Sequence, residues 1–130
     1  MFPPHLLLLI GPPAVGKSTL ASALQNRLPQ LKRFSIDEAR TQTSTEQQAW
    51  EIIQEYLTKE EGPGIFESSG LSYKLWEILL QENLSHQTHI ICLLDNTDRL
   101  HHRVEERDRD SRPTQVVEDE HAFIDYSAEA

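Results

Sequence analysis

Short apolar runs alternate with longer amphipathic stretches along the chain. The run from Leu6 to Ile10 is continuous, as expected of a central strand that is buried on both faces. Further strands are predicted at residues 33–37, 65–67 and 88–94, and the last of these is the clearest buried strand after the first. Strands of this length separated by helix-length segments predict an α/β fold.

Helical spacing of the apolar residues marks the segments between these strands. The first helix begins near Lys17 and ends before Pro29, which cannot continue it. Three more helices are predicted: one after a capping box at residues 43–46, one beginning near Ser72, and one around Leu100 and Val104. Residues 116–124 carry the spacing of a last helix, although residues 123–126 could instead form a short fifth strand.

The order of the predicted elements, βαβαβαβα, defines the expected architecture. It predicts one domain over residues 1–130, with a parallel sheet of about four to five strands and helices on both faces. In such sheets the ligand binds at the carboxyl ends of the strands. The residues that follow Ile10, Ile36, Phe66 and Leu94 are therefore expected to form the functional site.

Composition and charge narrow the possible partners. The chain is 38% hydrophobic and 25% charged, as in a globular protein, and its net charge is −9. This charge argues against a broad surface for duplex nucleic acid, although it leaves room for a local basic cleft. The single cysteine, Cys92, rules out an internal disulfide and fits a reducing compartment. No apolar run is long enough to span a membrane, so a cytoplasmic protein is expected.

The clearest motif is a phosphate-binding loop. Residues 11–18 read GPPAVGKS and match the pattern G-x-x-x-x-G-K-[ST] between a predicted strand and a predicted helix. Inward-facing backbone N–H groups and the positive end of the helix dipole bind phosphate oxygens in such a turn. Lys17 supplies a cation for the β- and γ-phosphates, and the Ser18 hydroxyl is a ligand for Mg²⁺. The predicted nucleotide-binding residues are Gly11, Pro12, Pro13, Ala14, Val15, Gly16, Lys17, Ser18 and Thr19.

Two further groups of polar residues follow strands. Asp37 and Arg40 form a D-x-x-R pattern after the second strand, where a carboxylate can orient an acceptor hydroxyl or cap the next helix. Arg103 and Arg107 are four residues apart and are predicted to share one helix face. They either close over phosphate or form a solvated surface with neighbouring acids. Two more arginines follow in a polar loop, Arg109 and Arg112.

These motifs together carry a family resemblance. The phosphate loop, the D-x-x-R pair and the arginines after the fourth strand resemble P-loop kinases of the polynucleotide-kinase and zeta-toxin type, and the related AAA-domain predicted kinases. The resemblance implies the three-layer P-loop NTPase fold, ATP as the donor and a lid near residues 101–115. It also implies that Asp37 is the general base and Arg40 a substrate clamp. Arg107 would be the lid arginine that stabilises the transition state, and Arg103 a second nucleotide contact.

Two other positions leave alternatives open. Glu67 ends the third predicted strand, where an acid can reach Mg²⁺ or the acceptor, or can cap the following helix. The related kinases carry aspartate there, so this role is implied only weakly. His101 and His102 are adjacent and lack the spacing of metal ligands, and both are predicted to be surface residues.

The sequence therefore predicts an ATP-dependent kinase that uses Mg²⁺. It would move the γ-phosphate to a hydroxyl of a small molecule or a nucleotide end. The alternative is a switch or regulatory module that binds a nucleoside triphosphate and hydrolyses it slowly. The acceptor and the oligomeric state stay open.

Overall fold

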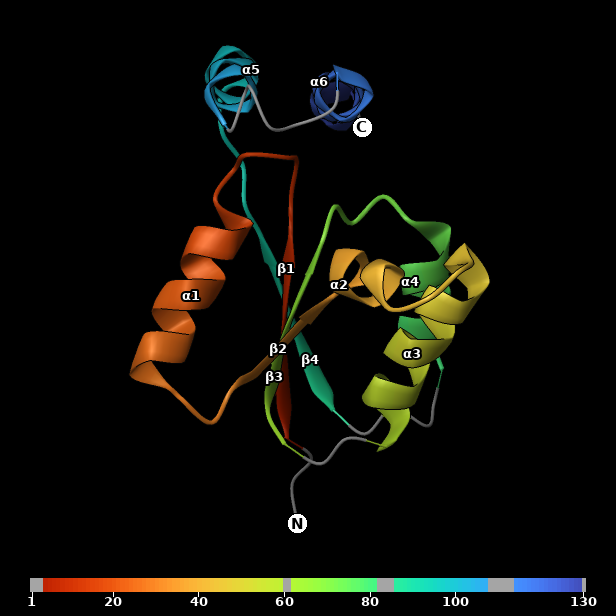
Figure 1. Cartoon of the computed structure of the whole chain (residues 1–130). Helices are drawn as coiled ribbons and strands as arrows, with labels where there is room; N and C mark the ends of the chain where they lie inside the picture. Colours follow the sequence, from red (N-terminus) through yellow and green to blue (C-terminus); the bar gives the residue numbers. More distant parts are fainter. Residues whose placement is uncertain (1–3, 60–61, 82–85, 108–113, 130) are drawn as a thin grey trace.

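The computed structural model describes residues 4–59, 62–81, 86–107 and 114–129. Within these residues, four parallel strands form one sheet in the order β2-β3-β1-β4. The strands are β1 (His5–Ile10), β2 (Lys32–Ser35), β3 (Gly64–Ser68) and β4 (Gln87–Cys92). Because β1 pairs with both β3 and β4, the phosphate loop that follows it emerges from the middle of the sheet (Figure 1).

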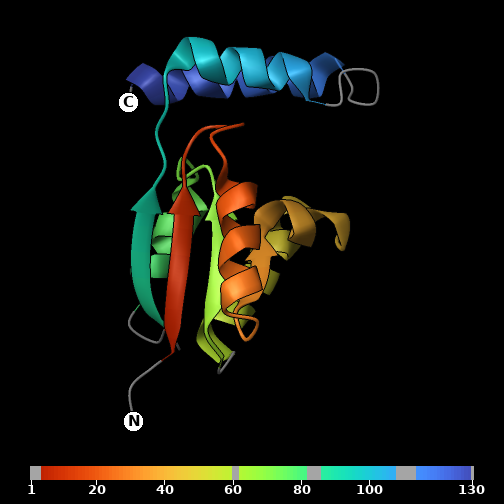
Figure 2. The ribbon, with the colours of Figure 1, turned by 90° about the vertical axis from the view of Figure 1, so that its left-hand side faces the viewer.

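Helices cover both faces of the sheet and its carboxyl edge. Helix α1 (Lys17–Arg27) lies on one face, and α3 (Glu46–Lys59) and α4 (Tyr73–Leu79) lie on the other. The short α2 (Ile36–Thr41) follows β2 directly. Helices α5 (Thr97–Glu106) and α6 (Thr114–Glu129) pack together and run across the carboxyl ends of the strands (Figures 1 and 2). The predicted three-layer α/β fold is confirmed.

Alternating strand residues divide the core between the two faces. On the face of α3 and α4, Leu8 and Phe66 are fully buried in a cluster with Ile53. On the face of α1, Leu9 and Ile65 are buried. Each such side chain contributes about 1.5–3 kcal/mol by leaving water. The continuous run of leucines in β1 is explained by this burial on both faces.

Strand β4 differs from the prediction. It was expected to be well buried, but among the described strands it pairs only with β1 and lies at the edge. Ile90 is 53% exposed, and Leu94, beyond the strand, is 81% exposed. Residues 123–126, considered as a fifth strand, lie inside α6. An apolar run identifies a strand without showing how many neighbours it has.

The boundaries of α2 and α3 also differ from the predicted ones, and the difference affects the site. The Ser35 hydroxyl accepts a hydrogen bond from Glu38 N at 3.1 Å and caps α2, so Asp37 lies in the first helical turn rather than in a strand. At α3, Thr45 caps the helix by accepting from Gln48 N at 3.1 Å, in place of the box predicted at residues 43–46. The Glu46 side chain is consequently available for another contact.

No helix in the described ranges is long and apolar enough to cross a membrane.

Candidate active site

The phosphate loop connects β1 to α1 through a backbone that only certain residues adopt. Gly11 has φ +154° and Gly16 has φ +109°, in the region that L side chains rarely occupy. A Cβ at Gly11 would also lie 2.5 Å from the carbonyl oxygen of Leu93. Ala14, with φ +66°, takes the left-handed conformation between them. Left-handed residues inside such a turn are what allow successive N–H groups to converge on an anion.

Lys17 lies folded against this loop. Its Nζ donates to the Gly11 carbonyl oxygen at 2.5 Å and to that of Pro12 at 3.2 Å. Burial lowers the pKa of Lys17 to about 8, an effect that nearby Glu67 and Asp37 partly oppose and Arg107 reinforces. The ammonium group is therefore held in a partly desolvated position where an added anion would strongly favour its charged form.

A hydrogen-bonded chain links the start of α1 to β3. The Ser18 hydroxyl donates to Glu67 Oε1 at 2.9 Å, and Arg33 Nε donates to Glu67 Oε2 at 2.7 Å. The Glu67 side chain is only 11% exposed, so its carboxylate is fixed rather than solvated. It does not cap α4, whose N-cap residue is Ser72. The hydroxyl and carboxylate oxygens are hard donors close together, which suits Mg²⁺.

Arg33 is a residue that the sequence analysis missed. It lies on β2, where its Nη1 also donates to Ser22 Oγ of α1 at 2.9 Å. A single basic residue in a short strand does not form a recognisable motif. Only the pairing of β2 with β3 brings Arg33 beside Glu67.

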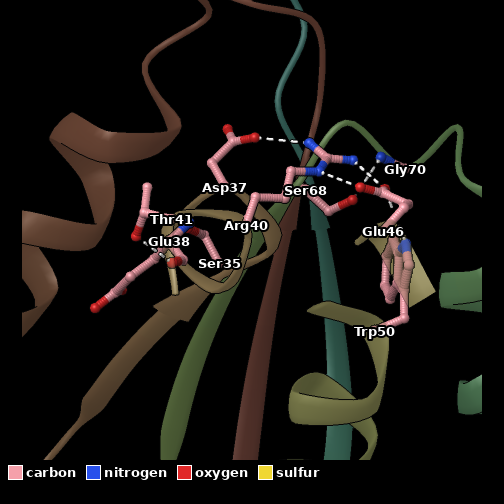
Figure 3. A network of polar contacts seen from close by, with 9 residues as sticks. All are labelled: Ser35, Asp37, Glu38, Arg40, Thr41, Glu46, Trp50, Ser68 and Gly70. Carbon is pink, nitrogen blue, oxygen red and sulfur yellow. Dashed lines mark hydrogen bonds and ion pairs between the residues drawn. The ribbon is translucent and has the colours of Figure 1, made fainter. Parts of the chain in front are cut away.

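Asp37 and Arg40 form part of a second network, drawn in Figure 3. Arg40 Nη1 donates to Asp37 Oδ1 at 2.8 Å, and its Nε and Nη2 donate to the two oxygens of Glu46 at 2.9 and 2.6 Å. Glu46 also accepts from Trp50 Nε1 at 3.2 Å. The hydrogen bonds with Glu46 raise the pKa of Arg40, and those from Arg40 lower the pKa of Glu46. Arg40 is thus held by two carboxylates and orients Asp37.

Arg103 and Arg107, the two arginines predicted to share one helix face, do not do so. Helix α5 ends at Glu106, and Arg107 adopts extended backbone angles, φ −79° and ψ 114°. Arg107 therefore lines the same cavity as Lys17 and Asp37, whereas Arg103 lines a second, smaller cavity. Arg109 and Arg112 lie outside the described residues.

Both Arg103 and Arg107 have a carboxylate partner. Arg103 Nη1 lies 3.0 Å from Asp95 Oδ2 and donates to the Ala14 carbonyl oxygen at 3.3 Å. This bond ties α5 to the phosphate loop. Arg107 Nη1 lies 3.8 Å from Glu120 Oε2 on α6. The same two helices also meet through buried Leu100, Val104 and Ile124, which pack against the loop residues Ala14 and Val15.

The main cavity has a volume of about 1210 Å³ and brings the predicted residues together. Lys17, Ser18, Asp37, Arg40, Glu67 and Arg107 all line it. The smaller cavity, of about 550 Å³, lies beside Ala14, Val15, Thr19, Leu20, Ala23 and Arg103. The main cavity is also lined by one face of α6, which the sequence analysis did not place in the site. Their helical spacing predicts a helix but not which part of the protein its face contacts.

The histidine prediction needs a correction for His101. Its Nδ1 lies 2.5 Å from Nδ1 of His121, and its Nε2 lies 2.8 Å from Asp125 Oδ1. His121 Nε2 lies in turn 2.7 Å from Glu105 Oε1. His101 is therefore part of the contact between α5 and α6 rather than a free surface residue. No group of three or more metal-binding side chains occurs within the described ranges.

The sheet order and a phosphate loop between β1 and α1 define a P-loop nucleotide-binding fold of the kinase type. The AAA domain family model matches residues 2–120, and the chain belongs to that family. No curated protein matches the chain.

Three solved structures share the fold. A chain of the Pnkp1/Rnl/Hen1 RNA repair complex has a TM-score of 0.75 at 17% identity, covering 99% of this chain and 46% of its own. A candidate kinase from Chloroflexus aurantiacus J-10-fl has a TM-score of 0.62 at 21% identity, and the match covers 91% of this chain and 75% of that kinase. A gluconokinase from Sinorhizobium meliloti 1021 has a TM-score of 0.63 at 16% identity, and the match covers 99% of this chain and 75% of that gluconokinase. The chain thus spans less than half the length of the first of these, and the resemblance to P-loop kinases is confirmed.

Proposed function

We propose that this protein transfers the γ-phosphate of ATP to an alcohol hydroxyl. The observation that carries the proposal is that Lys17, Asp37 and Arg107, from three separate segments, line one cavity. A nucleotide-binding loop alone would fit many functions. A carboxylate and a further arginine in the same cavity are what phosphoryl transfer requires in addition.

The donor end of the site is the phosphate loop. Its N–H groups and the start of α1 would bind the phosphate chain, and Lys17 would exchange its bonds to the loop carbonyls for bonds to phosphate oxygens. Ser18 and Glu67 would hold Mg²⁺, which when bound neutralises charge on the phosphates. Arg33 keeps the Glu67 carboxylate beside Ser18.

The acceptor hydroxyl would be oriented by Asp37. This side chain is 86% exposed, and Arg40 holds only its Oδ1, so an acceptor can reach the carboxylate. The hydroxyl oxygen attacks the γ-phosphorus as the bond to the β,γ-bridging oxygen breaks. The hydroxyl proton passes to Asp37 and then to water. The products are ADP and a phosphate ester.

Arg107 would stabilise the transferring phosphoryl group. It lines the same cavity as Lys17, which supports this role. Its contact with Glu120, at 3.8 Å, is long and would be exchanged for phosphate oxygens. An arginine in this position is worth about 10³-fold or more in rate.

The test is Asp37→Asn. The variant should still bind ATP, because the hydrogen bond described for Asp37 is with Arg40 and not with the loop, and should lose about 10²-fold or more in transfer. Asp98→Asn, an exposed acid at the start of α5 outside the cavity, is the matched control. The screen uses radiolabelled ATP with nucleosides, sugars, amino alcohols and 5′-hydroxyl oligonucleotides. Normal transfer by Asp37→Asn would show that another group takes the proton.

A nucleotide-dependent switch is the second candidate. It is favoured by the contacts of α5 with the phosphate loop through Arg103 and Val104, because a change in the loop would be passed to both lid helices. A switch predicts slow ATP hydrolysis that no acceptor accelerates. It also predicts a change in protease sensitivity of residues 97–129 between the ATP and ADP states.

A further inference from the structure

Four titratable side chains meet between α5 and α6, and none of them lines either of the two cavities. His101 and Glu105 lie one turn apart on α5, and His121 and Asp125 lie one turn apart on α6. Figures 1 and 2 show these two helices side by side over the carboxyl ends of the strands. We call the four residues the histidine cluster, and the proposed phosphate transfer makes no use of them.

The two imidazole rings of the cluster are stacked, with their centroids 4.8 Å apart. His101 Nε2 lies 2.8 Å from Asp125 Oδ1, and His121 Nε2 lies 2.7 Å from Glu105 Oε1. An ionised carboxylate only accepts hydrogen bonds, so both Nε2 atoms must carry a hydrogen. The third contact joins Nδ1 of one ring to Nδ1 of the other at 2.5 Å, and it needs one hydrogen between the two nitrogen atoms.

The number of hydrogens on the rings fixes the charge of the pair. The three contacts need three N–H groups, whereas two neutral rings carry two and two charged rings carry four. One imidazolium beside one neutral imidazole supplies the required three. A neutral pair would leave the Nδ1 lone pairs facing each other or one carboxylate without its donor. A doubly charged pair would set like charges face to face.

The charges that face the cluster fit a single imidazolium. Glu105 on α5 and Asp125 on α6 place one negative charge at each end, and the two histidine side chains are only 28% and 25% exposed. The phosphate-loop residues 14–15, which pack against the same helices, are uncharged. A further ion pair between the helices, Arg107 with Glu120, joins opposite charges at 3.8 Å. One positive charge on the rings is therefore balanced by carboxylates on both sides.

We infer that one proton shared between His101 and His121 fastens α6 to α5, and that this contact loosens as the pH rises. Losing the proton leaves two N–H groups for three contacts, so the contact weakens through the range in which histidine titrates, about pH 5–8. Buried Leu100, Val104 and Ile124 still join the helices, so α6 loosens rather than unfolds. Because one face of α6 lines the main cavity, the proton controls how firmly that wall is held. This contact is independent of the proposed kinase function.

Magnetic resonance of the ring nitrogens tests the shared proton directly. Protein containing isotope-labelled histidine is titrated from about pH 5.5 to 9 with EDTA present, so that no metal ion replaces the proton. Near neutral pH we expect both Nε2 atoms to be protonated and both Nδ1 atoms to resonate between the bare and the protonated values. His102, 71% exposed and 3.0 Å from Glu106 of its own helix, is the internal control and should titrate as a single ring. Two bare Nδ1 atoms at every pH, or a pair that titrates like His102, would overturn the inference.

Hydrogen exchange measures the consequence for α6. Protection of its amides, corrected for the intrinsic pH dependence of exchange, should fall about tenfold between about pH 6 and 8.5, the value of one hydrogen bond to a charged group. Amides of the paired strands β1 and β3 are the internal control and should keep their protection. His101→Phe keeps an aromatic ring without nitrogen, so its α6 protection should be lower and independent of pH. His102→Phe, on the same helix but outside the cluster, is the matched control and should behave as the wild type.

A second variant keeps the test decisive if His101→Phe does not fold. Asp125→Asn retains an oxygen acceptor for His101 Nε2 and removes the charge, so the fall in protection should move to lower pH. Variants at Glu105 are avoided, because that carboxylate has a further interaction. The role of the proton is contradicted by α6 protection that is independent of pH in the wild type, by an equal fall in His101→Phe, or by a fall at unchanged pH in Asp125→Asn. Every measurement uses the protein without substrate, so failure of the kinase proposal would leave this contact unaffected.

Discussion

The pKa of Lys17 couples nucleotide binding to a proton. Burial lowers that pKa to about 8, so near pH 8 about half of the molecules carry a neutral lysine. Only the ammonium form attracts phosphate, and bound phosphate favours the ammonium form. ATP binding at pH 8 should therefore take up roughly half a proton per nucleotide. Between pH 7.5 and pH 9 the apparent association constant should fall roughly eightfold, following the protonated fraction.

The stability of the free protein should change with pH in the opposite direction to the ATP affinity. Because the folded pKa of Lys17 is below the unfolded value of 10.5, the unfolded chain binds more protons between about pH 8 and 10.5. The contribution of Lys17 to stability therefore rises as the pH rises through this window. Apo stability and ATP affinity should diverge as the solution becomes alkaline, and a general loss of structure would lower both.

Calorimetry measures this linkage directly. ATP is titrated at pH 8 in two buffers with different ionisation enthalpies, and the difference in observed heat gives the protons taken up. Lys17→Arg is the control, because its guanidinium stays charged across the range and should take up none. Equal proton uptake by Lys17→Arg and the wild type, or an ATP affinity that is flat from pH 7.5 to 9, would refute the assignment of Lys17.

Two further predictions concern residues that support the structure of the site. Arg33→Met leaves the Glu67 carboxylate, 11% exposed, without its 2.7 Å partner, and should lower the free energy of unfolding by about 1–3 kcal/mol, measured by urea denaturation. Arg33→Lys should restore part of this loss, and an unchanged midpoint in Arg33→Met would show that the pair is not stabilising. Gly11→Ala places a Cβ 2.5 Å from the Leu93 carbonyl oxygen at φ +154°, so ATP binding should fall at least tenfold by calorimetry. Gly62→Ala, where a Cβ meets nothing within 4 Å, is the control, and equal ATP affinity in both variants would contradict the strain argument.

The parts of the site that could be read from the sequence are those built from neighbouring residues. Residues 11–18 form the phosphate loop by themselves once a strand precedes them and a helix follows, so a contiguous pattern was enough. The sheet edge that carries Asp37 and Glu67 followed from the rule for parallel strands. The cavity contains both residues, as expected.

Other features depend on contacts between distant segments. Arg33 meets Glu67 only because β2 pairs with β3. The exposure of β4 depends on how many strands lie beyond it, and the apolar run at Ile90 does not encode that number. Arg103 and Arg107 fit a helical spacing of four, but α5 ends at Glu106, so the two side chains enter different cavities. A spacing rule holds only as far as the helix extends.

The interpretation of Arg40 in the D-x-x-R motif changes once its contact with Glu46 is known. The D-x-x-R pattern fixes Asp37 and Arg40 one helical turn apart, which fits either a catalytic pair or two surface residues. Glu46, from the next helix, occupies two guanidinium nitrogens at 2.6 and 2.9 Å and directs the third toward Asp37 at 2.8 Å. This favours an arginine that positions Asp37, the proposed general base, over one that binds substrate phosphate. Both partners of Arg40 are carboxylates of the protein, and their three bonds use three of the five N–H donors of the guanidinium, so its orientation is set by the protein before any substrate arrives.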